Sequence, residues 1–245
     1  MNNSRPQLFG MLAGLFLAAG LVLSSVLATT TWLKVKNSQF IAVKGSTQND
    51  VNSDLIIWHG SFAASAATLL KAQHQLKDAR IKVGQFLNDH SVTNFTFAAI
   101  GIEEISASMK DANGWTQQRT AGYRLTQTVR VESGDLDRIT GLDSESTALV
   151  ESGVLFTTQP PQFIYTKLGA EKAGLLAEAT KDARVRAGQI AVQGRRRIIS
   201  LHDAEMGVFQ ITPLHSSQTS WDGENDTTSR EKTITAVVTA TFLLK

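Results

Sequence analysis

The feature that most constrains this chain is an apolar run close to its N-terminus. Residues Leu8 to Ala28 (LFGMLAGLFLAAGLVLSSVLA) contain no charged side chain. A helix of this length reaches roughly 32 Å, because each residue adds about 1.5 Å, and the hydrocarbon core of a bilayer is about 30 Å thick. The run therefore predicts a segment that crosses a membrane, and the residues after Trp32 are expected to fold as a domain attached to it.

Two interpretations of this N-terminal segment follow from its composition. Cleavage after Ala28 is compatible with the small residue there and with Val26 two positions earlier. The apolar core of a signal peptide usually covers about 7–15 residues, however, and this run is longer. We therefore favour an uncleaved inner-membrane anchor at residues 8–28, with the domain in the periplasm. The alternative is a soluble periplasmic protein released by cleavage.

The apolar run also contains small residues at four-residue spacing, namely Gly10, Gly14 and Ala18. This spacing places them on one helix face, as in membrane helices that dimerise. Small residues are common in membrane helices in general, so the pattern is equally compatible with a simple tether.

Composition limits what the rest of the chain can do. Removing the first 33 residues leaves 212 of the 245, enough for one medium domain or two small ones that share a core. The net charge is +2, and acidic and basic residues are interspersed, so we expect no nucleic-acid partner. The absence of cysteine excludes disulfides, thiolate metal sites and cysteine nucleophiles.

The first part of the domain alternates between strand and helix patterns. A short strand is predicted over residues 40–46, a polar turn over 47–52 and a second strand over 54–64. Between residues 66 and 90 apolar residues recur every three or four positions, which predicts a long amphipathic helix. Its stripe comprises Leu69, Gln73, Leu76, Ala79, Arg80, Val83, Phe86 and Leu87.

An antiparallel hairpin follows. Strands are predicted over residues 95–109 and 116–132, and the Asn-Gly dipeptide within residues 110–114 favours a tight turn between them. In the second strand, apolar positions from Tyr123 to Val131 alternate with polar ones, which is typical of a half-buried strand. Ser133 and Asp135 can cap a second helix, which is expected to turn Leu136, Ile139, Leu142, Leu149 and Val150 inward and to end near Gly153.

The last third of the chain returns to strands after one more helix. Because of Pro160–Pro161, we expect any strand within residues 154–166 to be interrupted or to lie at the edge of a sheet. A third helix is predicted over residues 167–193, where an alanine-rich stripe suggests close packing on a sheet and Gly194 supplies the end. Strands are predicted over residues 197–211, interrupted near 205–207, and over 233–243.

These elements predict the α+β class, with long amphipathic helices packed on an antiparallel sheet and one N-terminal transmembrane helix or signal sequence before them. The expected domains are residues 1–33, the anchor or signal segment, and residues 34–245. Residues 213–231 are polar and turn-rich, so we expect a flexible loop there.

Few residues suggest chemistry. The densest cluster of possible ligands is His202–Glu205, but neighbouring strand residues point to opposite faces, and the same holds for Glu103–Glu104. His59 is expected to be a hydrogen-bonded structural residue, and His74 and His90 are expected at the surface. We therefore predict no catalytic, cofactor-binding or metal-binding residues and no cofactor.

Two further features could mark a partner surface. Arg195–Arg197 follows the third predicted helix, where basic side chains favour the negative end of the helix dipole. Three residues release too few counterions to hold DNA alone. Trp115 and Trp221 lie in predicted turns, although a single exposed aromatic residue requires no partner.

The order and spacing of these elements resemble the SIMPL-domain family of bacterial exported proteins over roughly residues 40–245. The matching features are Ile41–Gly45, the Leu69–Leu87 stripe, Gly101–Ile102, Gly122–Tyr123, Val129–Leu136, Ala179–Ala187 and Gly194. Each is a turn glycine or a packing position, so the match depends on their combined order. Arg195–Arg197 and Pro160–Pro161 depart from the family's usual pattern.

The resemblance implies an envelope-associated protein with no established catalysis and no catalytic residues to transfer. It also implies assembly into ring-like oligomers and, for some members, a link to oxidative-stress tolerance. We therefore expect a non-enzymatic, membrane-tethered protein that acts by self-assembly or by binding an unknown protein partner. A ring would join copies through sheet edges such as residues 233–243. The alternative is an exported hydrolase or a small-ligand or peptide-binding protein whose site forms only in three dimensions.

The anchor interpretation predicts that the mature protein keeps its N-terminal segment. Mass spectrometry of protein extracted from membranes should find an intact mass that includes residues 1–28. A mature chain that begins at Thr29 would instead show cleavage after Ala28.

Overall fold

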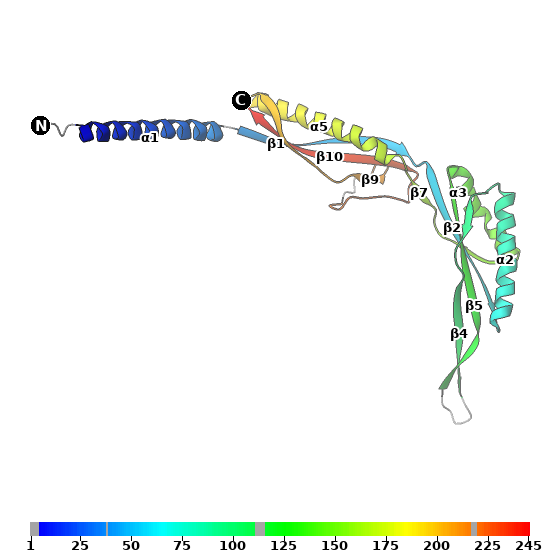
Figure 1. Cartoon of the computed structure of the whole chain (residues 1–245). Helices are drawn as coiled ribbons and strands as arrows, with labels where there is room; N and C mark the ends of the chain where they lie inside the picture. Colours follow the sequence, from blue (N-terminus) through cyan, green and yellow to red (C-terminus); the bar gives the residue numbers. More distant parts are fainter. Residues whose placement is uncertain (1–4, 38, 111–115, 217–219) are drawn as a thin grey trace. The chain divides into compact units, whose positions relative to one another are not determined.

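The fold is described from a computed structural model, which covers residues 5–37, 39–110, 116–216 and 220–245. Its helices and antiparallel sheets confirm the predicted α+β class (Figure 1). The helices are α1 (Arg5–Asn37), α2 (Leu69–Asp89), α3 (Leu136–Glu145), α4 (Thr147–Glu151) and α5 (Leu168–Gln193). The strands are β1 (Gln39–Asn52), β2 (Leu55–Ala66), β3 (Phe95–Phe97), β4 (Gly101–Lys110), β5 (Thr116–Ser133), β6 (Leu155–Thr158), β7 (Gln162–Ile164), β8 (Ile198–Met206), β9 (Gln210–Pro213) and β10 (Glu231–Leu244).

The chain divides into two compact units, which are described separately. The first unit comprises residues 1–47, 174–207 and 236–245, and the second comprises residues 48–173 and 208–235. The boundary expected between residues 33 and 34 stays a prediction.

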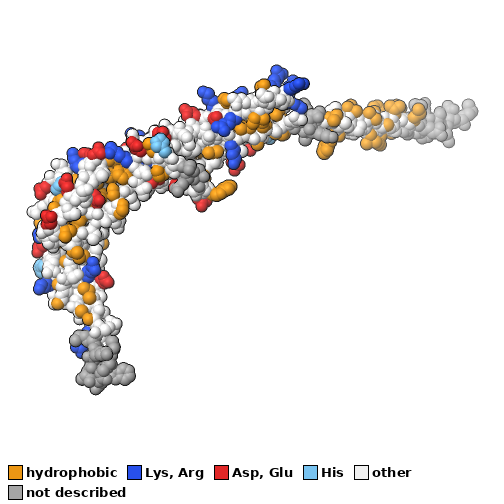
Figure 2. Space-filling view, turned by 180° about the vertical axis from the view of Figure 1, so that it is seen from behind, with side chains coloured by type: hydrophobic (Ala, Val, Ile, Leu, Met, Phe, Trp, Pro, Cys, Tyr) orange, Lys and Arg blue, Asp and Glu red, His pale blue; other side chains and the backbone are white. Residues whose placement is uncertain are grey.

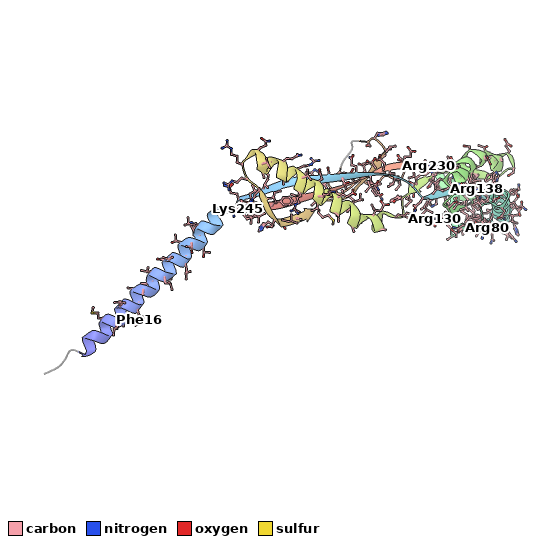
Figure 3. The ribbon with its side chains drawn as sticks, turned by 90° about the horizontal axis from the view of Figure 1, so that it is seen from above. Phe16, Arg80, Arg130, Arg138, Arg230 and Lys245 are labelled. Atoms are coloured by element: carbon pink, nitrogen blue, oxygen red, sulfur yellow. The ribbon has the colours of Figure 1, made fainter. Side chains whose placement is uncertain are left out.

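The N-terminal apolar run forms one continuous helix, α1. Within it, Met11–Leu33 is long and apolar enough to cross a membrane, and Figure 3 shows side chains such as Phe16 pointing outward from the helix. The span continues past Ala28 because the threonine hydroxyls bond inside the helix. Thr29 Oγ1 donates to the Ser25 carbonyl at 2.7 Å, and Thr31 Oγ1 donates to the Leu27 carbonyl at 2.8 Å. Both a membrane anchor and a signal sequence form such a helix.

The sheet that β10 belongs to corrects two predictions. β10 lies between β1 and β8, and β9 also pairs with it. The prediction that residues 233–243 form a free sheet edge is therefore wrong. The buried side chains at Val238, Ala240 and Phe242 are typical of an interior strand. β1 in turn continues through residues 47–52, where a turn was predicted. An outer strand tolerates such polar residues because much of its surface faces solvent.

The first unit depends on a close contact between α5 and β1. Ala179, Ala183 and Ala187 of α5 are fully buried against the sheet. A Cβ atom added at Gly45 would lie 2.2 Å from the Ala179 carbonyl oxygen and 2.3 Å from the Ala183 nitrogen. The alanine stripe therefore brings the helix backbone onto the strand, as its composition predicted.

The end of α5 differs from the prediction in one residue. The helix stops at Gln193, but the left-handed conformation belongs to Arg195, with φ of 55°, and not to Gly194. The N–H of Arg196 donates to the Ala191 carbonyl at 2.8 Å, which satisfies one of the last helical carbonyls.

The second unit is built around β2 and β5, which pair in antiparallel register from Ile56↔Ser133 to Ala66↔Tyr123. The predicted alternation of β5 is confirmed, since Leu125, Val129 and Val131 are buried. α2 packs against these two strands, and its buried residues join Trp58 and Phe62 of β2 in one core (Figure 1). The predicted stripe is wrong at Leu69, Gln73 and Arg80, which are exposed. The buried residues of α2 are Ala72, Leu76, Ala79, Val83, Phe86 and Leu87.

The helix predicted after Ser133 forms as two short helices, α3 and α4. Asp135 caps α3 by accepting a hydrogen bond from the Arg138 N–H at 3.1 Å, as expected. Gly153 follows α4 with φ of 84°, which suits a residue without a side chain. Val150 is exposed, contrary to the prediction that it faces inward. β6 and β7 lie on either side of Pro160–Pro161, as predicted.

The far part of the β4–β5 hairpin has no covering layer. β4 pairs with β5 from Gly101↔Thr126 to Lys110↔Thr116, while the pairing of β2 with β5 stops at Tyr123. Residues 101–106, 108 and 117–121 are exposed. Figure 1 shows these strands running on past the end of α2. We call residues 101–108 and 117–121 the ribbon. The Asn-Gly turn predicted between the two strands lies outside the described residues.

The contact at Gly45 predicts a large effect of one added methyl group. Gly45→Ala should destabilise the protein by about 1–3 kcal/mol, because the new Cβ atom would overlap backbone atoms that cannot move independently. Gly174→Ala is the control in the same unit, since nothing lies within 4 Å of its Cβ position and alanine favours a helix. Urea unfolding of both variants measures the difference. Equal stabilities would contradict the close contact.

Candidate functional site

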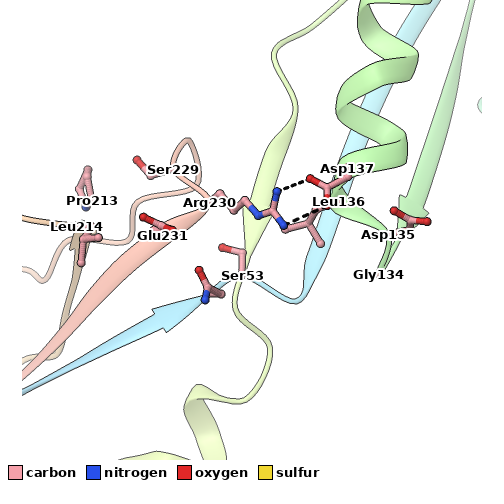
Figure 4. Close-up of a pocket in the computed structure, with 11 residues that line it drawn as sticks. Ser53, Gly134, Asp135, Leu136, Asp137, Pro213, Leu214, Ser229, Arg230 and Glu231 are labelled. Carbon is pink, nitrogen blue, oxygen red and sulfur yellow. Dashed lines mark hydrogen bonds and ion pairs between the residues drawn. The ribbon is translucent and has the colours of Figure 1, made fainter.

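The second unit contains a hollow of about 1050 Å³ at the junction of four segments (Figure 4). These segments are the link between β1 and β2, the start of α3, the end of β9 and the start of β10. The lining residues are Asn52, Ser53, Gly134, Asp135, Leu136, Asp137, Pro213, Leu214, Ser229, Arg230 and Glu231. We call it the Arg230 hollow.

An ion pair joins two sides of the hollow. Arg230 Nη1 lies 2.5 Å from Asp137 Oδ1, and Arg230 Nη2 lies 3.4 Å from Asp137 Oδ2 (Figure 4). The hydrogen bond from Arg230 holds the pKa of Asp137 below its usual range, and Asp137 raises the pKa of Arg230. Both side chains are exposed, so water screens the pair and its main effect is to fix the position of the guanidinium group.

The start of α3 contributes a second, compensated carboxylate. Asp135 caps the helix and also lies 3.2 Å from Arg138 Nη2. Its charge is therefore offset by a cation and by the positive end of the helix. Arg138 and Arg230 are both labelled in Figure 3.

Three polar groups of the hollow have no such partner. Ser53 is only 6% exposed, and its Oγ atom has no hydrogen-bond partner among the described residues. Figure 4 shows this hydroxyl turned toward the space between Arg230 and Glu231. Within the same described part of the chain, the Glu231 carboxylate and the Asn52 amide form no ion pair or side-chain hydrogen bond. A buried hydroxyl without a partner is unfavourable, so the hollow offers unused hydrogen-bonding capacity.

A buried ion pair fixes the chain on which Arg230 lies. Lys232 Nζ is 3.0 Å from Asp226 Oδ2, and both side chains are almost fully buried. Asp226 also accepts hydrogen bonds from the N–H groups of Thr228, at 2.8 Å, and Ser229, at 3.2 Å. Burial alone would raise the pKa of Asp226, but the hydrogen bond from the Thr228 hydroxyl, together with those from the N–H groups and from Lys232, outweighs it and holds the pKa far below its usual value.

The side chain of Gln210 also fixes the segment that precedes Arg230. Gln210 is buried and donates to the Ser220 carbonyl at 2.6 Å, while its Oε1 accepts from the Glu224 N–H at 2.8 Å. The flexibility predicted for residues 213–231 stays a prediction, but most of the described part of this segment has specific partners that its polar composition did not reveal.

The charge around the hollow is mainly negative. A smaller hollow of about 250 Å³ shares Asn52, Leu214 and Glu231 with it and adds Asp50 and His215. Together the two linings contain four acidic residues, one arginine and one histidine. No group of three or more His, Cys, Asp or Glu residues within the described ranges could hold a metal ion. The arrangement is suited to binding by charge and hydrogen bonds.

The cluster predicted at His202–Glu205 lies on β8, outside the hollow. Pairing with β10 shifts register between Asp203 and Leu201, which leaves His202 at a bulge. The His202 ring packs on Phe40 with centroids 4.6 Å apart. Glu103 and Glu104 are exposed on β4, where Glu104 accepts a hydrogen bond from the Thr120 hydroxyl.

Three other histidines were singled out, and the His59 ring forms no hydrogen bond within the described residues, contrary to the prediction. His59 is half-buried on β2, opposite Arg130 of β5, and His74 is exposed on α2, as predicted. His90 was also expected at the surface but is partly buried at the end of α2. Its Nδ1 lies 2.7 Å from the Phe86 carbonyl oxygen, and its Nε2 lies 2.6 Å from Glu145 Oε2.

The remaining singled-out residues are exposed where the structure describes them. Arg195–Arg197 directly follows α5, as predicted. Trp221 is 98% exposed, and Trp115 lies outside the described residues. Figure 2 shows acidic and basic side chains interspersed over most of one face, in keeping with the sequence.

Sequence reasoning did not find the Arg230 hollow. Of its charged residues, only Asp135 had a recognised role, as a helix cap. Asn52–Ser53, Asp137 and Arg230 come from segments separated by about 80 or more residues, and no spacing pattern connects them. Their proximity depends on strand pairing.

Comparisons with known proteins bear on the whole chain. A family model described as SIMPL, protein of unknown function (DUF541), matches residues 41–242. The curated proteins contain no match. The de novo designed protein Foldit4 is 9% identical, with a TM-score of 0.21 and coverage of 43% of this chain and 93% of that one.

Two natural proteins of known structure are also similar to parts of the chain. An amidase of the hydantoinase/carbamoylase family from Burkholderia phymatum is 9% identical, with a TM-score of 0.26 and coverage of 58% of this chain and 36% of that one. AtUAH in complex with (S)-hydroxyglycine is 12% identical, with a TM-score of 0.23 and coverage of 60% and 36%. The chain thus spans about a third of the length of these two proteins, and likenesses this low carry no functional argument.

The buried pair beside the hollow predicts a pH-dependent loss of stability. Because the pKa of Asp226 is lower in the folded state, its contribution is fully present above the unfolded pKa of about 3.9 and is lost as pH falls further. Asp226→Asn should lower the free energy of unfolding by about 3–5 kcal/mol at pH 7, since Lys232 would stay buried without its counter-ion. Urea unfolding at pH 7 and below pH 4 should show the difference from the unmodified chain shrinking.

Asp222→Asn removes an exposed carboxylate from the same segment and serves as the control. A similar small effect of both substitutions would contradict a stabilising role of the buried pair.

Proposed function

The chain belongs to the SIMPL family, whose proteins have no assigned function, and from this premise we propose that it is a membrane-tethered envelope protein that acts without catalysis by assembling with further copies of itself. The N-terminal apolar helix supports attachment to a membrane. We assign the anchor to the inner membrane and the domain to the periplasm, with release after signal cleavage as the alternative.

The single observation that carries the proposal is the ribbon. Within the described residues, β4 pairs with β5 alone, and residues 117–121 of β5 pair with β4 alone. Each strand therefore has an outer edge whose backbone N–H and C=O groups lack strand partners. Such edges are templates for pairing with another chain.

The exposure of the ribbon adds to this argument. A two-stranded sheet is at best marginally stable in water when no layer covers it. The ribbon nevertheless exposes Ile102 and Ile105, with 62% of Ile102 accessible to solvent. Additional strands alongside β4 would extend the sheet and satisfy backbone groups that now face water.

The sequence of β4 is compatible with a second copy as the partner. Two β4 strands paired antiparallel about Ile105 would place Glu104 opposite Ser106 and Glu103 opposite Ala107. No like charges would then face one another. The register shift in the hairpin skips Ala121 on β5, so β4 itself stays regular enough to pair.

A role in tolerance of oxidative or envelope stress is the remaining part of the proposal and rests on the family resemblance. A deletion strain as resistant to oxidants and detergents as its parent would remove this part.

Assembly through the ribbon should be sensitive to charge on β4. Ser106→Lys combined with Ser108→Lys should convert an oligomer of the full-length protein into a species of lower mass, because lysines on an edge strand oppose pairing with another strand. Size-exclusion chromatography with multi-angle light scattering in a non-ionic detergent measures the mass. Gln73→Lys with Gln85→Lys adds the same charge to the exposed face of α2 and should leave the mass unchanged.

The outcomes separate two claims. A full-length protein that stays monomeric at all concentrations would overturn self-assembly. An oligomer that resists the β4 lysines would leave assembly standing but remove the ribbon as its interface.

A further inference from the structure

The Arg230 hollow is unusual in its balance of hydrogen-bonding groups. Asp137 is paired with Arg230, and Asp135 is paired with Arg138. Glu231 is the remaining carboxylate of its lining, and it has no ion-pair partner among the residues that the structure describes. The adjoining hollow adds Asp50, which accepts a hydrogen bond from the Thr233 hydroxyl at 2.7 Å but forms no ion pair in the described part of the chain. The two linings thus hold more acidic than basic side chains, with Arg230 close enough to Glu231 for that carboxylate to raise the pKa of the guanidinium.

Three unused groups belong to residues that line the hollow. They are the Glu231 carboxylate, the amide oxygen of Asn52 and the buried hydroxyl of Ser53. Asn52 and Ser53 are consecutive, and the Ser53 N–H donates to the Arg230 carbonyl at 2.9 Å, which ties them to the residue before Glu231. All three groups can accept a hydrogen bond.

The charge and the acceptors together define the ligand. An anion is disfavoured, because the guanidinium of Arg230 is already engaged and the start of α3 already has two carboxylates. A metal ion is disfavoured because the carboxylates of the described residues do not converge as a ligand set. A primary ammonium group has three donors and no acceptor, which matches one carboxylate and two neutral acceptors.

The remaining lining suits a short alkyl chain. Leu136, Pro213 and Leu214 supply apolar surface to the same hollow. Long ammonium side chains bury their methylene groups on such surfaces while the charged end is hydrogen-bonded. A volume of about 1050 Å³ leaves ample room for a chain of four or five carbons.

We propose that the Arg230 hollow binds a primary alkylammonium group, with Glu231 as the counter-ion and Asn52 and Ser53 as hydrogen-bond acceptors. The same chemistry occurs in a free polyamine and in a lysine side chain of a protein or peptide. This binding does not depend on assembly through the ribbon, which shares no residue with the hollow.

The proposal is tested by calorimetric titration of the full-length protein in a non-ionic detergent. The probes are cadaverine and Nα-acetyl-lysine amide, and the neutral control is Nα,Nε-diacetyl-lysine amide, which has the same chain without the charge. We expect binding of at least one amine and at least tenfold weaker binding of the neutral compound. Preference for cadaverine would indicate a free polyamine, and preference for the lysine derivative would indicate a lysine side chain.

Two substitutions locate the binding. Glu231→Gln should weaken binding at least tenfold, whereas Glu224→Gln, in the same segment but outside both hollows, should not. Ser53→Ala should weaken binding severalfold while leaving the thermal midpoint unchanged or higher, since it removes a buried hydroxyl without a partner. If Ser53→Ala loses binding while its thermal midpoint is unchanged or higher, misfolding cannot be the cause.

The proposal is overturned if neither amine binds, if the neutral compound binds as well as the amines, or if Glu231→Gln binds like the unmodified chain.

Discussion

Backbone hydrogen bonding between strands is the interaction on which both units depend, because it decides which strands are interior and which side chains can be buried. β10 has neighbours on both sides, and so do β2 and much of β5. Each of these strands buries every second side chain under a helix. In the first unit the covering layer is an alanine stripe in contact with glycine, whereas in the second it is a set of large apolar side chains. The layers differ, but the pairing constraint is common to both.

The same constraint explains what is left available for partners. Pairing that stops at Tyr123 leaves the ribbon with two outer edges and two exposed faces. Pairing of the ends of β9 and β10 brings residues 229–231 beside Ser53 and the start of α3, which creates the Arg230 hollow. The ribbon offers backbone groups and the hollow offers side-chain acceptors. These two kinds of surface suit different partners, namely a strand and a small cation.

The sequence predicted the elements whose periodicity is strong. The alternation along β5, the alanine contact of α5 and the break at Pro160–Pro161 all agree with the structure, and so do the apolar positions of the α2 stripe from Leu76 to Leu87. Each of these signals is local, because it depends on neighbours within a few residues. The family resemblance also depended on local signals, namely the order and spacing of turn glycines and packing alanines, and it identified the family correctly.

Long-range relations could not be predicted from these signals. Residues 233–243 have a composition that both edge strands and interior strands can have. Only their pairing with β1 and β8 shows that they form an interior strand. The turn expected at residues 47–52 is a strand because pairing compensates for polar composition. Ser53, Asp137 and Arg230 give no sequence signal as a group, since each one is unremarkable in its own segment and their meeting is a result of topology.

The central claim is that the free edge of β4 pairs with another copy of the chain, and hydrogen–deuterium exchange of the full-length protein tests it most directly. Amides in residues 101–108 should exchange more slowly as protein concentration rises, because pairing would protect those that now face solvent. Residues of α2 should show no such dependence. Exchange in residues 101–108 that stays equally fast in samples shown to be oligomeric would contradict the account.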